Sequence, residues 1–169
     1  SEISVLKRFE IPESQAIGDK KNIVKLARPI FPLPDLYNVA AGAGHVVAIP
    51  DTDGAIRRVS SVINCNDKYY LAFALEIAAS YLGVKRRDIR IILGRYIDLR
   101  MTREGRIRIP IDKNGKFLVN WTAPWGHGFK HYPFWKVVSS YQKELKGGRP
   151  LINLNEFRNK ICLVGLTAT

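Results

Sequence analysis

Cysteine is scarce in this chain, which has only Cys65 and Cys162 among its 169 residues. Two cysteines cannot build the disulfide framework that holds small secreted domains together. Each lies in an apolar segment typical of a buried strand, so we expect two free thiols that pack as small hydrophobic side chains. A single disulfide between them is the alternative, and the sequence leaves that choice and the redox compartment open.

Long hydrophobic runs are also missing. No apolar stretch reaches the roughly 20 residues that a membrane-spanning helix needs. The first residues, Ser-Glu-Ile-Ser-Val, lack the basic start and apolar centre of a signal peptide. We expect one domain over residues 1–169, because this length suits a single hydrophobic core. We also expect it to be a fragment of a larger protein, since it begins within one predicted strand and ends on another.

Catalytic signatures are absent as well. The sequence has no nucleophile elbow, no Walker loop and no dinucleotide-binding glycine pattern. We therefore predict no enzymatic activity, no catalytic residue and no cofactor. A hydrolase fragment has only the α/β pattern in its favour, which is an analogy of fold and no evidence of a site.

Two segments resemble metal sites, and both fail. Asp51-Thr52-Asp53-Gly54 begins like a calcium loop, but its fifth, seventh and twelfth positions are Ala55, Arg57 and Val62. His127 and His131 stand four residues apart, but the glycines beside His127 argue against a helix, and no further ligand lies nearby. We predict no metal site.

Positive charge is what the sequence has in excess, with a net charge of +12. Between Lys85 and Arg108, nine basic residues stand against three acidic ones, which leaves +6, half of the total, within 24 residues. Such a segment favours anionic partners such as nucleic acid, lipid headgroups or a phosphorylated ligand. A solvated surface that keeps the protein soluble is the equally supported alternative.

The hydrophobic pattern predicts an α/β fold, a mixed β-sheet with β-hairpins that is flanked by helices in a layered sandwich. Helices are predicted at residues 36–41, 68–82 and 134–145, and the second is apolar nearly all round, as in a helix buried on most sides. Strands are predicted at residues 4–9, 23–26, 88–93, 95–101, 106–111 and 160–166. The last is a near-continuous apolar run, typical of a central strand buried on both faces.

Two turns of similar chemistry organise the predicted sheet. Residues 51–54 (Asp-Thr-Asp-Gly) join an extended run at 46–49 to a second at 55–59, and residues 112–115 (Asp-Lys-Asn-Gly) join 106–111 to 116–121. Aspartate at the start of a turn can bond to its own backbone, and glycine accepts a positive φ. We predict a β-hairpin around each turn.

Three separated blocks stand out in the sequence: Gly44-His45 with residues 50–58, residues 109–138 and residues 160–168. In their order and spacing they resemble the type-two CHASE domain, a sensory extracellular domain associated with cyclases and histidine kinases. Gly44-His45 followed by residues 50–58 resembles its G-h-x-x-x-x-D-x-D-G-x-x-R motif. Residues 109–138 resemble its acidic-glycine turn, strand and aromatic loop, through Asp112, Gly115, Val119-Asn120-Trp121, Phe129, Tyr132, Phe134 and Val137-Val138. Residues 160–168 resemble its closing strand. The resemblance covers about residues 32–169, and these residues resemble the C-terminal portion of such a domain.

The resemblance implies an extracytoplasmic sensor of a bacterial membrane protein, tethered by transmembrane helices to a cytoplasmic cyclase, diguanylate cyclase or kinase. The implied partners are an unidentified small ligand and the fused helices and output module. The resemblance does not identify the ligand, and the net positive charge leaves an anion open. A homodimer is left open, and nucleic acid is not an expected partner. The alternative function is a basic module that binds nucleic acid or anionic lipid, motivated by the charged segment and its aromatic neighbours.

The candidate ligand-binding residues come from the first predicted hairpin, namely Asp51, Asp53 and Arg58, and from the aromatic loop, namely Trp121, Trp125 and His127. A structural role is the favoured alternative at the hairpin, where Asp51 would order the turn and Arg58 would pair with it or with a helix C-terminus. For the loop, the favoured alternative to a ligand pocket is packing in the hydrophobic core.

Overall fold

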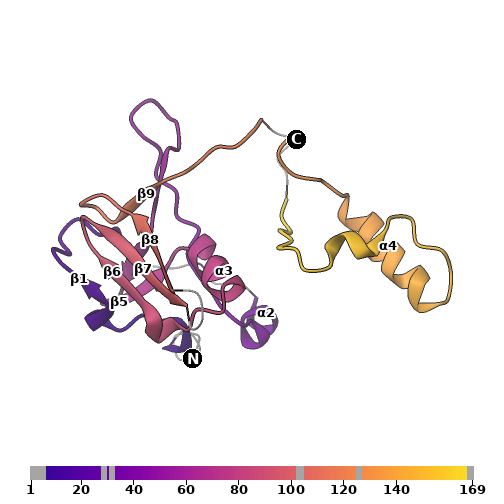
Figure 1. The fold of residues 1–169 in the computed structure, drawn as a ribbon, viewed down its shortest axis with the longest axis horizontal. Coiled ribbons are helices and arrows are strands. Elements are labelled where there is room, and N and C mark those ends of the chain that lie inside the picture. The colour runs from indigo at the N-terminus through magenta and orange to yellow at the C-terminus, as the bar shows by residue number, and fades with distance from the viewer. Residues whose placement is uncertain (1–6, 28–29, 31–32, 102–104, 125–126, 167–169) are drawn as a thin grey trace. The chain divides into compact units, whose positions relative to one another are not determined.

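The structure, a computed structural model of the 169-residue chain, describes residues 7–27, 30, 33–101, 105–124 and 127–166. The chain divides into two compact units, Ser1–Asn120 and Trp121–Thr169. The first unit contains the β-sheets with helices α2 (Pro34–Val39) and α3 (Phe73–Tyr81), and the second contains α4 (Phe134–Leu145) (Figure 1). Mixed sheets with helices confirm the predicted α/β class. A single domain over residues 1–169 stays a prediction.

The first sheet has four strands in the order β1-β6-β7-β8. Their bounds are β1 Ala16–Ile17, β6 Ile89–Ile92, β7 Tyr96–Met101 and β8 Gly105–Pro110. β1 runs parallel to β6, and the other neighbours are antiparallel. Side chains alternate between the two faces, so Ile97 and Leu99 are buried while Arg100 is exposed. The strands predicted at residues 88–93, 95–101 and 106–111 are confirmed.

The second sheet has the order β2-β4-β5, with β2 Lys25–Leu26, β4 Val62–Cys65 and β5 Lys68–Leu71. Asn66 and Asp67 join β4 to β5 with φ angles of 51° and 59°, as in a tight two-residue hairpin turn. The prediction of a helix over residues 68–82 is therefore wrong in its first part, and neither residue caps a helix. The period-two burial of Tyr69 and Leu71 is that of a strand.

Helix α3 covers the core with one face only. Leu75 and Ala79, four residues apart, are buried, whereas Phe73 and Tyr81 are 42% and 67% exposed. The expected burial on most sides is wrong, because apolar composition all round a helix does not by itself supply elements to cover it.

The third sheet is a two-stranded pair that neither predicted hairpin anticipates. β3 (Arg58–Ser60) pairs antiparallel with β9 (Lys116–Leu118), with Arg58 opposite Leu118. Both turns form, but the strands on either side of each do not pair with one another: residues 46–49 form no strand, and β8 pairs with β7. The long-range pairing is held by Ser61, whose backbone N–H and hydroxyl both donate to the carbonyl of Gly115 at 2.8 and 2.6 Å.

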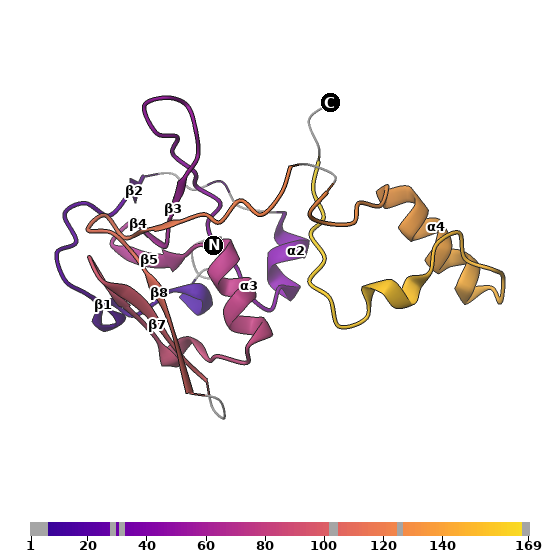
Figure 2. The same ribbon diagram turned by 45° about the horizontal axis from the view of Figure 1, so that its top comes forward.

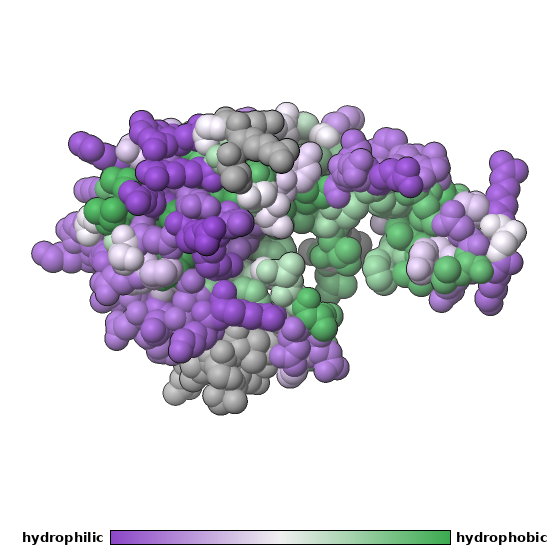
Figure 3. Space-filling view, turned by 60° about the horizontal axis from the view of Figure 1, so that its bottom comes forward, coloured by the Kyte–Doolittle hydropathy of each residue, from purple (hydrophilic) through white to green (hydrophobic). Residues whose placement is uncertain are grey.

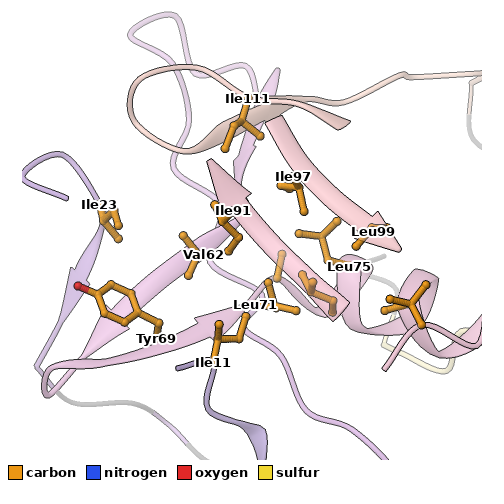
Figure 4. Packing of buried hydrophobic residues seen from close by; sticks show 14 residues of the cluster. Ile11, Ile23, Val62, Tyr69, Leu71, Leu75, Ile91, Ile97, Leu99 and Ile111 are labelled. Atoms are coloured by element: carbon orange, nitrogen blue, oxygen red, sulfur yellow. The ribbon is translucent and has the colours of Figure 1, made fainter. Parts of the chain in front are cut away.

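Side chains of both larger sheets and of α3 meet in one hydrophobic cluster. Figure 4 shows residues of β4, β5, β6, β7 and α3 pointing toward one another. Leu71, Ile91 and Ile97 are fully buried at its centre. The N-terminal segment contributes Ile11, whose N–H donates to the Tyr69 carbonyl at 2.8 Å. Burial of each large aliphatic side chain stabilises the fold by about 1.5–3 kcal/mol.

The N-terminal segment differs from its predicted pattern. Residues 7–9 form a short 3₁₀ helix, η1 (Lys7–Phe9), in place of a strand, and residues 4–6 lie outside the described residues. After η1, residues 13–17 form a second 3₁₀ helix, η2 (Glu13–Gln15), followed by β1. The helix predicted near residue 36 is confirmed as α2, with Pro34 in its first turn. A further 3₁₀ helix, η3 (Arg86–Asp88), precedes β6.

The second unit is built on α4, which forms with its predicted bounds, and η4 (Leu154–Phe157). Ser140 of α4 is fully buried, and its Oγ accepts the N–H groups of Leu151 and Ile152 at 3.1 and 3.2 Å. The same hydroxyl donates to the Lys136 carbonyl at 2.7 Å. Because one side chain satisfies two backbone donors, it fixes the segment after α4 against the helix.

The closing segment is not the buried strand that its apolar composition predicts. Residues 160–166 form no strand, and Leu163 and Val164 are each 77% exposed. No strand occurs among the described residues of the second unit, so the run has no ladder to join within it. Cys162 is accordingly exposed, contrary to expectation, whereas Cys65 is buried in β4, and both thiols are free. In the part of the chain that the structure describes, no helix is long and apolar enough to cross a bilayer.

Candidate functional site

The acidic turn lies in a long loop between α2 and β3 that projects from the sheets in two views (Figures 1 and 2). The Asp51 N–H donates to the Ala55 carbonyl, and the Gly54 N–H donates to the Asp51 carbonyl, at 2.9 and 2.8 Å. Gly54 has a φ of 82°, which a residue with a Cβ adopts only at a cost. The Asp53 carboxylate accepts the Ala55 N–H at 3.1 Å. The local sequence therefore closes the turn without help from another element.

Arg57 holds both carboxylates of the turn. Its Nη1 donates to Asp51 Oδ2 at 3.2 Å and to Asp53 Oδ1 at 2.9 Å, and its Nη2 donates to Asp53 Oδ2 at 2.7 Å. The hydrogen bonds that Arg57 donates hold the pKa of Asp53 below its usual range, and the two carboxylates that accept them raise the pKa of Arg57. We name Asp51, Asp53 and Arg57 the Arg57 clasp.

Arg58 stands outside this clasp. It is exposed at the start of β3, and among the described residues its guanidinium has no ion-pair partner. The interpretation in which Arg58 pairs with Asp51 is wrong, because Arg57 makes that pair. Successive residues of an extended chain point to opposite sides, so the choice between two adjacent arginines depends on a register that the sequence does not reveal.

Gly44 brings the start of this loop against the N-terminus of α3. A Cβ at this position would lie 2.6 Å from the Phe73 Cα and 2.8 Å from the Leu71 carbonyl oxygen. The next residue, His45, is locked there: its N–H donates to the Leu71 carbonyl and its carbonyl accepts the Phe73 N–H, both at 2.9 Å. The glycine is needed for close approach of two backbones.

The imidazole of His45 is held neutral. Burial lowers its pKa from 6.5 to about 4. Nδ1 accepts the Val47 N–H at 3.3 Å, so the ring proton of the neutral form resides on Nε2. That Nε2 is buried and has no hydrogen-bond partner among the described residues. Sequence reasoning singled out the Gly44-His45 pair only as a motif and missed this buried donor.

A second ionic contact of the first unit ties α3 to the N-terminal segment. Glu76 lies 2.8 Å from Nη2 of Arg86, whose Nη1 donates to the Phe9 carbonyl. The Gln15 side chain donates to the Arg86 carbonyl at 3.0 Å. Burial raises the pKa of Glu76, and the positive charge of Arg86 opposes that shift. These side chains connect elements of the first unit through contacts within it.

The aromatic loop belongs to the second unit, and its three candidate residues remain a prediction. Trp121 is 71% exposed and His127 is exposed, whereas Trp125 lies outside the described residues. The exposure of Trp121, Phe129 and Phe134 also contradicts the alternative in which the loop packs in the core.

What the loop does supply is a polar cluster around Glu156. The Glu156 carboxylate accepts both the Tyr132 hydroxyl and the Lys130 ammonium, and the Tyr132 ring packs 5.3 Å from that of Phe157. The Lys130 and Tyr132 hydrogen bonds lower the pKa of Glu156, and its hydrogen bonds raise the pKa values of Lys130 and Tyr132. Lys130 and Glu156 are 26 residues apart, which is why this pairing has no local signal in the sequence.

No group of three or more His, Cys, Asp or Glu residues that could hold a metal occurs within the described ranges. The chemistry that these sites offer is therefore recognition through charge and hydrogen bonds. Among the first unit's candidate residues, Arg58 is an exposed cation, whereas Asp51 and Asp53 are both bound by Arg57, which offsets one of their two negative charges.

Comparison with known proteins agrees with the motif blocks. A family model described as the CHASE2 domain matches residues 8–169, which spans both units and begins well before the motif blocks at about residue 32. Neither a curated protein nor a solved structure matches the chain.

Proposed function

The chain belongs to the CHASE2 domain family, and on that premise we propose that it is the input domain of a bacterial transmembrane signalling protein. CHASE2 domains are sensory extracellular domains of signalling proteins, which bind small ligands. The proposed output module is a cytoplasmic adenylate cyclase, diguanylate cyclase or histidine kinase joined through transmembrane helices, and the proposed location is the periplasm or cell exterior. The family match over residues 8–169 is the observation that carries this proposal.

The loop of residues 45–58 is the proposed ligand contact, with Arg58 as its principal binding group. Asp51 and Asp53 share the charge of Arg57, so a cationic ligand would have to displace that guanidinium from both carboxylates. Arg58 has no such competitor among the described residues. A small anion is therefore the ligand class that the loop accepts best, through the fork of donors that arginine presents to carboxylate or phosphate.

The role of Asp51 and Asp53 in this proposal is to position the loop. The Arg57 clasp holds the turn closed, and the segment from Ala55 leads directly into β3. A ligand bound at Arg58 would thus contact β3, the strand that pairs with β9. In the sequence, the first unit ends at Asn120. Trp121, Trp125 and His127 follow that boundary in the chain, and we keep them as secondary ligand-binding candidates of the second unit.

A thermal-shift series tests the ligand class. Inorganic phosphate, sulfate, succinate and citrate are the probes, and an anion that binds the folded state raises the midpoint of unfolding as its concentration increases. Arg58→Gln is expected to abolish the shift. Lys113→Gln, which removes an exposed charge of the same unit, is the matched control and is expected to preserve it. Equal shifts in both variants would show that Arg58 is not the binding group.

The signalling assignment has an independent test in the natural gene. Sequencing the regions on both sides of this segment is expected to reveal transmembrane helices and a cyclase or kinase module. A full-length protein without any transmembrane helix would contradict the assignment, whatever the anion series shows. Sedimentation equilibrium of the purified domain tests the homodimer, which two-fold signalling receptors commonly require.

A further inference from the structure

The outward face of sheet β1-β6-β7-β8 carries four arginines in two adjacent rows. Strand register places Arg90, Asp98 and Arg108 in one row and Arg100 beside Arg106 in the next. All four arginines are exposed. We name this surface the arginine face.

The opposite side of the same strands is apolar and buried. Ile91 and Ile97 are fully buried, and Ile89 and Leu99 are almost so. This alternation turns every arginine of these paired strands outward, so four basic residues of the segment seen in the sequence share one face of the sheet. In Figure 3, hydrophilic residues cover much of the larger part of the molecule in that view, with hydrophobic residues among them.

Asp98 forms ion pairs with two residues of the arginine face, Arg100 and Arg106. It is only 5% exposed, although it lies on the outward side of β7. Its Oδ1 is 3.1 Å from Nε of Arg106, and its Oδ2 is 3.6 Å from Nε of Arg100. A buried carboxylate restricts these two guanidinium groups before any partner arrives, which lowers the side-chain entropy lost on binding. Asp88, the residue before β6, is the second acid near these arginines after Asp98. Two negative charges against four positive ones leave the arginine face with a net positive charge.

An apolar row borders the arginines. Register aligns Ile17, Ile92, Tyr96 and Pro110 across the four strands. Ile17 is 48% exposed, and the Arg108 guanidinium lies 4.5 Å from the centre of the Tyr96 ring. The surface therefore passes from apolar and aromatic side chains at one end of the strands to guanidinium groups at the other.

We propose that the arginine face rests on an anionic phospholipid surface. Guanidinium groups on one open sheet face can reach phosphates that lie in a plane, and each basic residue near an anionic bilayer contributes about 1 kcal/mol. The neighbouring apolar row with a tyrosine is the composition that settles at the boundary of headgroups and acyl chains. Single-stranded nucleic acid is favoured less, because the ring of Tyr96 that would stack on a base is occupied by Arg108.

This contact goes beyond ligand sensing, because it would set the orientation of the sensor on the membrane. It uses Arg90 and Arg108, whereas the proposed ligand site uses Arg58. The two proposals can therefore fail separately.

Vesicle flotation of the 169-residue protein tests the proposal. Vesicles of phosphatidylcholine are compared with vesicles of equal parts phosphatidylcholine and phosphatidylglycerol, at low and at high salt. We expect binding only to the second kind, and weakening as salt rises. The double variant Arg90→Gln with Arg108→Gln is expected to bind about 30-fold more weakly. Arg100 and Arg106 are retained so that Asp98 keeps its partners.

The matched control removes the same charge elsewhere. Lys143→Gln with Lys146→Gln changes two exposed lysines of the second unit and is expected to bind within about twofold of the unaltered protein. Circular dichroism of both double variants verifies that they are folded. Equal binding by the two double variants overturns the proposal, as does equal binding to both kinds of vesicle. Displacement from vesicles by a single-stranded oligonucleotide at equimolar phosphate also overturns it, because the face would then be a nucleic-acid site.

Discussion

Arg57 and Asp53 form a two-pronged ion pair. Nη1 of Arg57 donates to Oδ1 of Asp53 at 2.9 Å, and Nη2 donates to Oδ2 at 2.7 Å. The pair is i,i+4 in sequence but lies in a turn. Asp51 adds a third bond to the same guanidinium. The turn of residues 51–57 is thus closed by one guanidinium group that binds two carboxylates, and all three side chains are at least partly exposed.

Replacing Arg57 by Gln is expected to loosen this turn with little loss of global stability. Both partners are exposed, and exposed ion pairs contribute little in water. The pKa of Asp53 is expected to return toward its ordinary value, because the hydrogen bond from Arg57 is the main cause of its lowering. Carboxyl NMR titration measures that change. An unaltered Asp53 titration would show that Arg57 does not hold the turn in solution, and Arg58→Gln serves as the neighbouring control.

Gly44→Ala is expected to destabilise the first unit by about 1–3 kcal/mol, the cost of forcing a methyl group into filled space. Its Cβ would lie 2.6 Å from the Phe73 Cα, so a backbone segment must move. Urea denaturation measures the loss. Gly165→Ala is the matched control, since nothing lies within 4 Å of a Cβ there and no change is expected. A stable Gly44→Ala protein would mean that α3 and the loop are farther apart than the structure places them.

His45 is expected to make the first unit acid-sensitive. Burial lowers its pKa from 6.5 to about 4. Between these pH values the imidazole is protonated in the unfolded chain and neutral in the folded chain. Stability therefore rises with pH between these values and is lost as the pH falls from 6.5 toward 4, by roughly 2–4 kcal/mol. Urea midpoints across this range, compared with those of His45→Asn, measure the effect.

The variant His45→Asn is expected to flatten the pH profile. His127→Asn changes an exposed histidine of the other unit and is expected to leave the profile steep. If both variants follow the unaltered protein, other groups govern the acid response.

Local sequence predicts the elements of this fold better than their partners. The meander from β6 to β8 was predictable, because the alternation Arg106-Ile107-Arg108-Ile109 specifies both an extended chain and its buried face. Turn chemistry at Asp51 and Asp112 was equally readable. The turns do not specify which strands pair. β3 pairs with β9, and the hydrogen bond from the buried Ser61 hydroxyl to the Gly115 carbonyl holds that pairing.

The acidic turn was predictable from the sequence, whereas the arginine that closes it was not. The motif and its charges predicted the acidic turn and a functional arginine beside it. Which of the two adjacent arginines binds the aspartates depends on strand register: Arg57 binds them, and Arg58 is exposed. The neutral His45 and the pairing of Lys130 with Glu156 depend on tertiary burial and on long-range contact, which no local pattern encodes. At residues 160–166 the apolar composition predicts a buried strand, but the segment is exposed and forms no strand. A strand is buried only where neighbouring elements cover it, and composition alone does not show whether they are present.

Ser140→Ala is expected to destabilise the second unit selectively. The substitution leaves the N–H groups of Leu151 and Ile152 without their acceptor, at about 1–3 kcal/mol for each donor that stays buried. Amide hydrogen exchange at these two positions is expected to accelerate while exchange in β7 is unchanged. Ser139→Ala, one residue earlier in α4, is the control and is expected to leave both rates as they are. Faster exchange throughout the chain would show that the two units unfold together.

Asp67→Gly is expected to stabilise the first unit. Asp67 is held at a φ of 59°, in the left-handed region where a residue with a Cβ is disfavoured by about 1–2 kcal/mol. Asn-Gly is the pair that two-residue hairpin turns prefer, and here it would follow β4 and precede β5 with register unchanged. The gain is reduced by the greater freedom of glycine in the unfolded chain, so we expect a net increase near 0.5–1 kcal/mol in urea denaturation. The Asp67 N–H that donates to the Asn64 side chain is retained, so that bond does not confound the result. A decrease in stability would show that residues 66 and 67 do not form the tight turn that converts the predicted start of a helix into β5.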